Sequence, residues 1–314
     1  TGLVDPNAAT TVVNVPINTS DKNDTLVYVL NTQRTQGCES DDTVLVIVRP
    51  QPVVTATPLN DTICSGPPPF TVTLFSQLPS TTFQFFTTPV TDITGNVSGS
   101  GGTISQTLTN SGTVSRLVTY KVVGTSIFSC TSDTTVVTVL VHPTVTFSVV
   151  PNVLTICSED SAIFNMSSPI AGTTYTWTAS GLNSTSGSGS SIRQKLINGG
   201  TAPQSVVYTI TASANGCLSQ TTDVTVTVNP KPVATATPLS SVQCTGATTS
   251  IALGSNISGT TFTWTSAPVT DISGNADGSG SSISQTLTNS GTTPATVTYI
   301  ITPTAPAGVG SCPG

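Results

Sequence analysis

The sequence predicts an all-β protein made of tandem β-sandwich repeats of about ninety residues. Cysteines recur at a nearly constant interval in two series, late ones at Cys38, Cys130, Cys217 and Cys312 and early ones at Cys64, Cys157 and Cys244. Three of the late cysteines precede an alternating Thr/Val segment that ends at a proline joint. Thr and Val favour extended backbone, only 5% of residues are aromatic, and no stretch has helical periodicity.

The repeats divide the chain into four parts. Residues 1–50 are the C-terminal half of a repeat, 51–142 and 143–229 are complete repeats, and 230–314 form a repeat without its last strand. We number these parts as the first to the fourth repeat. Because a half-sandwich exposes its inner face, we expect the native polypeptide to extend beyond both ends.

Strands are expected wherever two-residue alternation is clear. In the first repeat these are 11–17, 25–31 and 43–49. In the second repeat a first strand at 51–58 leads into TICSGPPPF, where the prolines at 67–69 indicate a turn or a sheet edge. The strands expected after it are 70–76, 82–87, 103–109, 116–123 and 134–141, with a Gly/Ser loop at 92–102.

One aromatic side chain occurs at the same place in each of the three later repeats, at Phe85, Trp177 and Trp264. Each lies in an alternating strand, and one face of such a strand is buried. We therefore expect these residues to anchor the cores. Stacking on a ligand is the alternative for Trp177 and Trp264.

Each complete repeat holds one early and one late cysteine, which predicts one disulfide per repeat. The expected pairs are Cys64–Cys130, Cys157–Cys217 and Cys244–Cys312, with Cys38 bonded to a cysteine upstream of this sequence. Each would close a loop of sixty-odd residues and contribute about 4 kcal/mol. Seven free thiols are the alternative, but periodic, paired cysteines in a Lys-poor chain are typical of an oxidising exterior.

Composition argues against several functions. A net charge of −6 with eight Lys and Arg disfavours nucleic acid as a partner, and no apolar run reaches the ~20 residues that span a bilayer. The single histidine, His142, precedes a proline at a joint, and the carboxylate pairs Asp41–Asp42 and Glu159–Asp160 lie in turns. We expect no enzymatic activity and no cofactor.

The loop DISGNADGSG at 271–280 weakly resembles a calcium loop, because Asp271, Asn275 and Asp277 supply oxygen atoms between glycines. Its counterpart in the second repeat has Ser98 in place of the second aspartate. A flexible loop is the favoured interpretation, and a calcium site is the alternative.

Five Asp-Thr or Asp-Ser pairs are followed by an apolar residue or Thr, a pattern that resembles the O-glycosylation motif of Bacteroidetes. The candidate acceptors are Thr25, Thr43, Thr62, Thr134 and Ser161. The alternative is that Asp-Thr simply begins strands.

The whole sequence resembles the PKD-like and immunoglobulin-like repeats of very large Bacteroidetes surface proteins, including gliding-motility adhesins exported by type IX secretion. The motifs that carry the resemblance are NPKPVATATP at 229–238, TICSG at 62–66, YTWT and FTWT at 175–178 and 262–265, SISQTLTNSG at 282–291 and YTITASANGC at 208–217. The resemblance implies tandem immunoglobulin-like sandwiches in a secreted, cell-attached stalk.

We therefore expect a structural stalk or spacer of a giant bacterial cell-surface adhesin or surface filament. Disulfide-stapled repeats would present a distal adhesive region. The expected partners are neighbouring repeats of the same chain, with other cell-surface proteins or surface glycans as further partners. Two alternatives stay open: the repeats themselves bind glycans or surfaces, or they assemble into an extracellular fibre by strand exchange.

Overall fold

The computed structural model describes residues 7–8, 10–33, 37 and 39–314. The chain packs into two compact units, Thr1–Thr144 with Asn215–Cys217 and Val145–Ala214 with Leu218–Gly314. Its ordered elements are strands, apart from the short 3-10 helix η1 at Ala307–Val309, so the all-β prediction is confirmed. Within the described ranges, no helix is long and apolar enough to cross a membrane.

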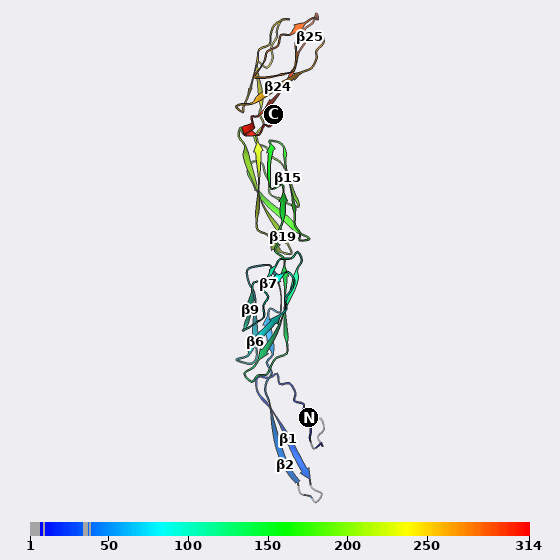
Figure 1. Ribbon diagram of the computed structural model, residues 1–314, viewed down its shortest axis with the longest axis vertical. Helices are drawn as coiled ribbons and strands as arrows, with labels where there is room; N and C mark the ends of the chain where they lie inside the picture. The colour runs from blue at the N-terminus through cyan, green and yellow to red at the C-terminus, as the bar shows by residue number, and fades with distance from the viewer. Residues whose placement is uncertain (1–6, 9, 34–36, 38) are drawn as a thin grey trace. The chain divides into compact units, whose positions relative to one another are not determined.

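The first repeat contributes an antiparallel hairpin of β1 (Asp24–Gln33) and β2 (Glu39–Val48), which pairs Tyr28 with Val44 (Figure 1). Of the strand predicted at 11–17, only an isolated bridge at Val13 forms. In the second repeat the equivalent segment pairs with the strand at 70–76. Val44 on the hairpin is 56% exposed, whereas its equivalent Val137 is fully buried.

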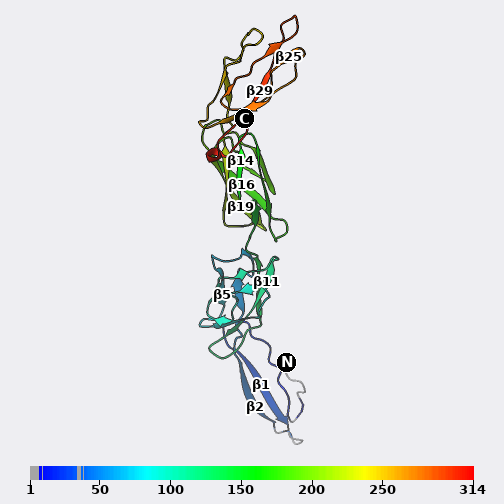
Figure 2. The same ribbon diagram turned by 45° about the horizontal axis from the view of Figure 1, so that its top comes forward.

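The second repeat is a sandwich of two sheets, and β5 and β11 in Figure 2 mark one sheet each. One sheet has the order β3 (Val54–Thr57), β5 (Phe70–Ser76) and β9 (Thr103–Gln106). The other has the order β4 (Asn60–Cys64), β12 (Thr135–His142), β11 (Arg116–Thr125), β6 (Thr82–Thr87) and β8 (Gly99–Ser100). A small ladder joins β7 (Ile93–Thr94) to β10 (Thr109–Asn110).

The last strand of the second repeat, β12, lies between β4 and β11. It runs antiparallel to β11, with Val137 opposite Tyr120, and parallel to β4, with His142 opposite Cys64. The prolines after TICSG predicted a turn or a sheet edge, and the segment contributes the edge strand β4 up to Cys64 before the turn begins.

The second unit contains the third and fourth repeats. The third repeat has the same plan. One sheet has the order β13 (Ser148–Val150), β15 (Ser161–Ser167) and β18 (Ser191–Lys195). The other has the order β14 (Val153–Cys157), β21 (Thr222–Asn229), β19 (Gln204–Ala214), β16 (Thr174–Ser180) and β17 (Gly187–Ser188), and β20 (Cys217–Leu218) also pairs with β19. The fourth repeat has three small sheets. The first has the order β22 (Ala234–Thr237), β23 (Ile251–Ser255) and β27 (Ser282–Ile283). The second has the order β26 (Gly278–Ser279), β24 (Thr261–Ser266) and β29 (Tyr299–Thr304), and the third pairs β25 (Ile272–Ser273) with β28 (Thr288–Asn289).

The core of each complete sandwich lies between its two sheets. Alternation buries one face of the longer strands, so that Val72 and Ile104 of one sheet and Tyr120 of the other are fully buried. The Tyr120 hydroxyl donates to Gln106 Oε1 at 2.6 Å, and the Tyr208 hydroxyl bonds its glutamine at 2.9 Å. Burial raises the pKa of both tyrosines to about 12.

The aromatic side chains expected in the cores are buried, with 6% exposure for Phe85, 8% for Trp177 and 6% for Trp264. Each ring lies against a glycine of a neighbouring two-residue strand. A β-carbon there would come within 2.8 Å of the ring at Gly99, 2.7 Å at Gly187 and 2.5 Å at Gly278. The glycines therefore leave the space that the rings fill.

Candidate functional site: disulfide links and repeat joints

Two disulfides connect successive repeats. Cys64 is bonded to Cys217 and Cys157 to Cys312, each with 5.7 Å between the Cα atoms. In both, the early cysteine of one repeat meets the late cysteine of the next repeat. This corrects the expected bonds within a repeat, Cys64–Cys130, Cys157–Cys217 and Cys244–Cys312. Cys130 and Cys244 are free thiols, and Cys38 lies outside the described residues.

The sheet topology explains why a repeat does not bond its own cysteines. Cys64 ends β4, opposite His142 at the C-terminal end of β12, whereas Cys130 lies in the turn before β12 begins. A strand of 8 residues spans more than about 20 Å at about 3.3 Å per residue. Disulfide Cα atoms must come within about 4.4–6.8 Å. The two cysteines are therefore at opposite ends of one sandwich.

The late cysteine is presented by a tight turn. Asn215 and Gly216 have φ angles of 53° and 80°, the left-handed values of a two-residue hairpin turn, and Cys217 follows directly. Residues Asn215–Cys217 pack with the first unit although their strands belong to the second. The ANGC turn therefore places the Cys217 sulfur outside its own sandwich.

The joint between the third and fourth repeats is packed as well as bonded. Asn229 is buried, and Cys312 has no exposed surface. The backbone of Gly310 approaches the Asn229 side chain so closely that a β-carbon would overlap it, and Gly310 has a φ of 93°. Lys231 also pairs with Glu159 at 3.7 Å. The segment before Cys312 therefore rests on the proline joint at 229–232.

An asparagine ties the last strand of a repeat to the loop that follows the asparagine itself. Asn198 is 4% exposed, and its Nδ2 donates to the carbonyls of Ala202 at 2.9 Å and Val228 at 2.8 Å. Its Oδ1 accepts from the Gly200 amide at 2.9 Å. The same bonds to a last-strand valine carbonyl are made by Asn18 to Val48 and by Asn110 to Val141.

Sequence reasoning missed this asparagine, although the signal was present. TNSG, INGG and TNSG recur at 109–112, 197–200 and 288–291, always after an Ile-Ser-Gln or Ile-Arg-Gln segment. The glutamine of that segment accepts one hydrogen bond from the core tyrosine hydroxyl and another from a loop backbone amide. Gln194 does so with the Tyr208 hydroxyl and the Thr185 amide. The recurring polar motif is thus a hydrogen-bond scaffold rather than a loop without contacts.

We expect Asn198→Ala to destabilise the third repeat by about 1–3 kcal/mol, because it leaves the buried Val228 carbonyl without its donor. Urea unfolding followed by Trp177 fluorescence, in a Trp264→Phe background, measures this loss. The matched variant is Asn289→Ala in the fourth repeat, followed by Trp264 fluorescence in a Trp177→Phe background, since Asn289 bonds no last-strand carbonyl in the described structure. Equal losses for the two variants would contradict the tying role.

The candidate glycosylation residues Thr25, Thr43, Thr62, Thr134 and Ser161 are all exposed. The aspartate carboxylates of Asp42 and Asp61 accept from the backbone amides of Thr43 and Thr62 at 2.8 and 2.7 Å. The aspartates therefore orient the backbone while the hydroxyls face solvent. Glycosylation at these residues stays a prediction.

The loop considered for calcium is held by its own hydrogen bonds. Asp277 Oδ1 accepts from the Ser266 amide at 2.8 Å, and Asn275 Nδ2 donates to Ala267 O at 3.0 Å. Among the described residues, no group of three or more His, Cys, Asp or Glu side chains is placed to hold a metal ion.

His142 Nδ1 bonds the Ser115 hydroxyl at 2.7 Å. The single histidine is therefore bonded to a residue of its own repeat.

Comparisons with solved structures give low similarity to tandem modules. They include fibronectin(III)-like modules of Clostridium thermocellum CbhA, with 14% identity over 61% of this chain and 99% of that chain at a TM-score of 0.28. The three N-terminal domains of the bacteriophage RB49 outer capsid protein Hoc match with 12% identity over 81% and 91% at 0.30. Four immunoglobulin domains of Dscam1 isoform 1.9 match with 13% identity over 65% and 54% at 0.28.

None of the curated proteins compared with this chain matches it. The profile of the PKD-like domain matches three times, at residues 55–145, 154–232 and 241–314. These matches cover most of the chain and follow the second, third and fourth repeats. The chain therefore belongs to the PKD-like domain family.

Proposed function

We propose that this chain is a structural stalk or spacer of a giant bacterial cell-surface adhesin or surface filament, whose disulfide-linked repeats hold a distal adhesive region away from the cell. The observation that carries the proposal is the pairing of the early cysteine of one repeat with the late cysteine of the next. A binding domain needs only its own fold to be stable. Bonds between successive repeats serve the array as a whole.

The two disulfides add a second covalent connection at the joints that follow the second and the third repeat. The bonded cysteines are 153 and 155 residues apart in sequence, and the two loops overlap over residues 157–217. A chain-entropy treatment gives about 5 kcal/mol for a loop of this length. Because each bond also spans a proline joint, we expect it to restrict bending between the repeats that it joins.

Several features support an extracellular site. Disulfides persist in oxidising compartments, and PKD-like and immunoglobulin-like repeats with disulfides are typical of extracellular structural or adhesion modules. The resemblance to Bacteroidetes adhesins supports attachment to the cell surface, with the exposed Asp-Thr sites carrying glycans. The partners of each repeat are then its neighbours in the same chain.

Small-angle scattering of the purified chain, with and without reductant, tests the spacer function. We expect a narrow distribution of dimensions for the oxidised chain and a broader one after reduction or in a Cys64→Ser/Cys157→Ser variant. Cys130→Ser is the matched control, because it removes a thiol without removing a bond. Identical scattering from all forms, or specific binding of the oxidised chain to a glycan surface, would instead favour a different role.

A further inference from the structure

The two disulfides between repeats differ in how far their cysteines are open to solvent. Cys64 is exposed at the end of β4, and its partner Cys217 is 3% exposed. In the other bond Cys157 is only partly exposed, and Cys312 has no exposed surface. Thiol–disulfide exchange requires a thiolate to reach a sulfur atom of the bond. A dissolved thiol therefore reaches Cys64 more easily than any of the other three cysteines.

Cys312 is covered because the chain around it folds over its sulfur. Its carbonyl accepts from the Ala305 amide at 2.9 Å, and its Sγ lies 3.8 Å from the Gly310 carbonyl. Gly310 in turn lies against the buried Asn229 side chain at the joint. A thiolate that attacks the Cys312 sulfur has to displace these contacts first.

The residues that follow the two early cysteines differ in charge. Cys157 is followed by Ser-Glu-Asp, and the Asp160 carboxylate accepts from the Cys157 amide at 3.3 Å. Lys231 offsets the charge of Glu159 at 3.7 Å, which leaves the Asp160 carboxylate as the net charge of this segment. Cys64 is followed by Ser-Gly-Pro-Pro-Pro, which carries no charge.

The acids near Cys64 are turned away or already paired. Asp61 is three residues earlier on β4, which is about 10 Å along the strand and on its opposite face. Asp92, at the same end of the sandwich, pairs with Arg116 at 2.6 Å. The residue opposite Cys64 on β12 is His142, which carries no negative charge. An anionic thiolate therefore meets less repulsion at Cys64 than at the early cysteine of the third repeat.

We propose that Cys64–Cys217 is a redox-sensitive link that a low-molecular-weight thiol opens first, whereas Cys157–Cys312 resists reduction. A thiolate attacks the Cys64 sulfur, the bond to Cys217 breaks, and Cys217 leaves as a thiolate that takes up a proton. A second thiol molecule attacks the mixed disulfide, which frees Cys64 and gives the oxidised thiol as product. Only the joint that follows the second repeat then loses its extra connection. The order of reduction does not depend on the spacer function.

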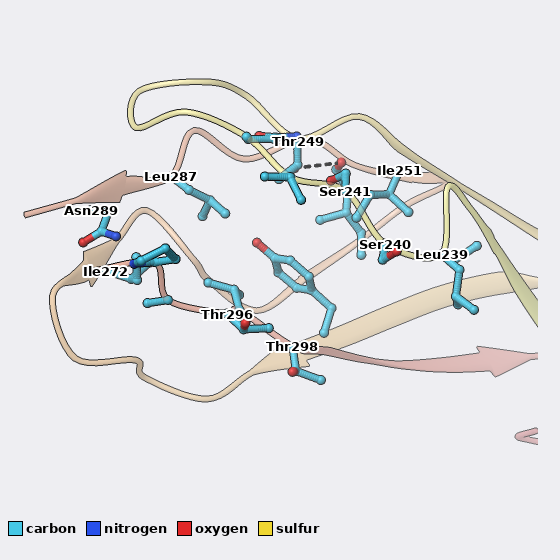
Figure 3. Close-up of a pocket in the computed structure, with 18 of the residues that line it drawn as sticks. Leu239, Ser240, Ser241, Thr249, Ile251, Ile272, Leu287, Asn289, Thr296 and Thr298 are labelled. Carbon is cyan, nitrogen blue, oxygen red and sulfur yellow. Dashed lines mark hydrogen bonds between the residues drawn. The ribbon is translucent and has the colours of Figure 1, made fainter. Parts of the chain in front are cut away.

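The test follows both bonds in one full-length molecule. A Cys38→Ser/Cys130→Ser/Cys244→Ser variant keeps the two disulfides and removes every other thiol of the chain. Cys244 in particular is exposed, on the cavity of about 630 Å³ that Ser240 and Thr298 also line (Figure 3). Its thiol would otherwise compete with the added one.

Glutathione is added at neutral pH, the reaction is stopped by alkylation at intervals, and peptide mass spectrometry follows each cysteine. We expect Cys64–Cys217 to open at least about tenfold faster than Cys157–Cys312, because access and charge both favour attack there. The first adduct should carry glutathione on Cys64 and leave Cys217 as a thiol. Equal rates for the two bonds, or faster opening of Cys157–Cys312, would overturn the proposal.

A second thiol separates charge from access without any change to the chain. Glutathione is anionic, whereas cysteamine carries a positive ammonium group. If the Asp160 carboxylate repels the anion, the ratio of the two reduction rates should be smaller with cysteamine at low ionic strength. The same ratio for both thiols would remove charge from the explanation and overturn that part of the proposal.

A matched pair of variants tests the same carboxylate directly. Asp160→Asn should speed the opening of the resistant bond by glutathione about twofold to fivefold, the size expected for one exposed charge. Asp61→Asn is the control, because it removes a carboxylate that also accepts from a backbone amide but faces away from Cys64. Trp177 fluorescence verifies that the third repeat stays folded in Asp160→Asn. Equal effects of the two variants on their nearest bonds would contradict the role of Asp160.

Discussion

Cutting the chain between the second and third repeats should leave the two fragments joined until reductant is added. A site-specific protease sequence inserted after Thr144, which is exposed, provides the cut. Cys64 and Cys217 lie on either side of it and are bonded. Without reductant we expect one species of full mass, and with reductant two fragments. Bonds confined to single repeats would instead release both fragments at once.

Variants of single cysteines make this experiment specific. Cys217→Ser should separate the fragments without reductant, while Cys130→Ser should leave them joined, because Cys130 is a free thiol. The two variants are matched, since both cysteines occupy the turn before the last strand of a repeat. A Cys38→Ser/Cys130→Ser/Cys244→Ser background removes every cysteine outside the two disulfides and so prevents bonds between molecules. Separation of the unmodified chain without reductant would contradict the disulfides between repeats.

Local pattern predicted the strands well but not the cysteine pairs. Alternating residues such as those of 134–141 and 70–76 show which segments are strands, because alternation records burial of one face. The pairing of Cys64 depends on β4 lying parallel to β12, which sets the two cysteines of one repeat at opposite ends. No local pattern encodes that direction, and one early and one late cysteine in each complete repeat fit either arrangement.

The prediction for residues 11–17 failed for a related reason. TVVNVPI has the alternation of a strand, but a strand also needs a neighbouring strand along its length, and in this segment only Val13 forms an isolated bridge. The fourth repeat shows the same dependence, since 240–244 and 295–298 match strands elsewhere yet stay irregular. In both places sequence gives the propensity and the neighbouring strand decides the outcome.

Removing a core tyrosine should test how much the last strand contributes. Tyr208 is fully buried and its hydroxyl bonds Gln194 at 2.9 Å, while Tyr299 makes the equivalent bond at 2.8 Å but remains partly exposed. We expect Tyr208→Ala to destabilise the third repeat by about 3–5 kcal/mol, the usual loss for a buried aromatic side chain. Tyr299→Ala should cost the fourth repeat clearly less, since part of its ring already contacts solvent.

The two tryptophans allow each repeat to be followed separately, because Trp177 lies in the third and Trp264 in the fourth. Urea unfolding of Tyr208→Ala in a Trp264→Phe background and of Tyr299→Ala in a Trp177→Phe background gives the two losses. Equal costs would show that β21 contributes little to the burial of Tyr208, and the contrast between covered and uncovered cores would be wrong.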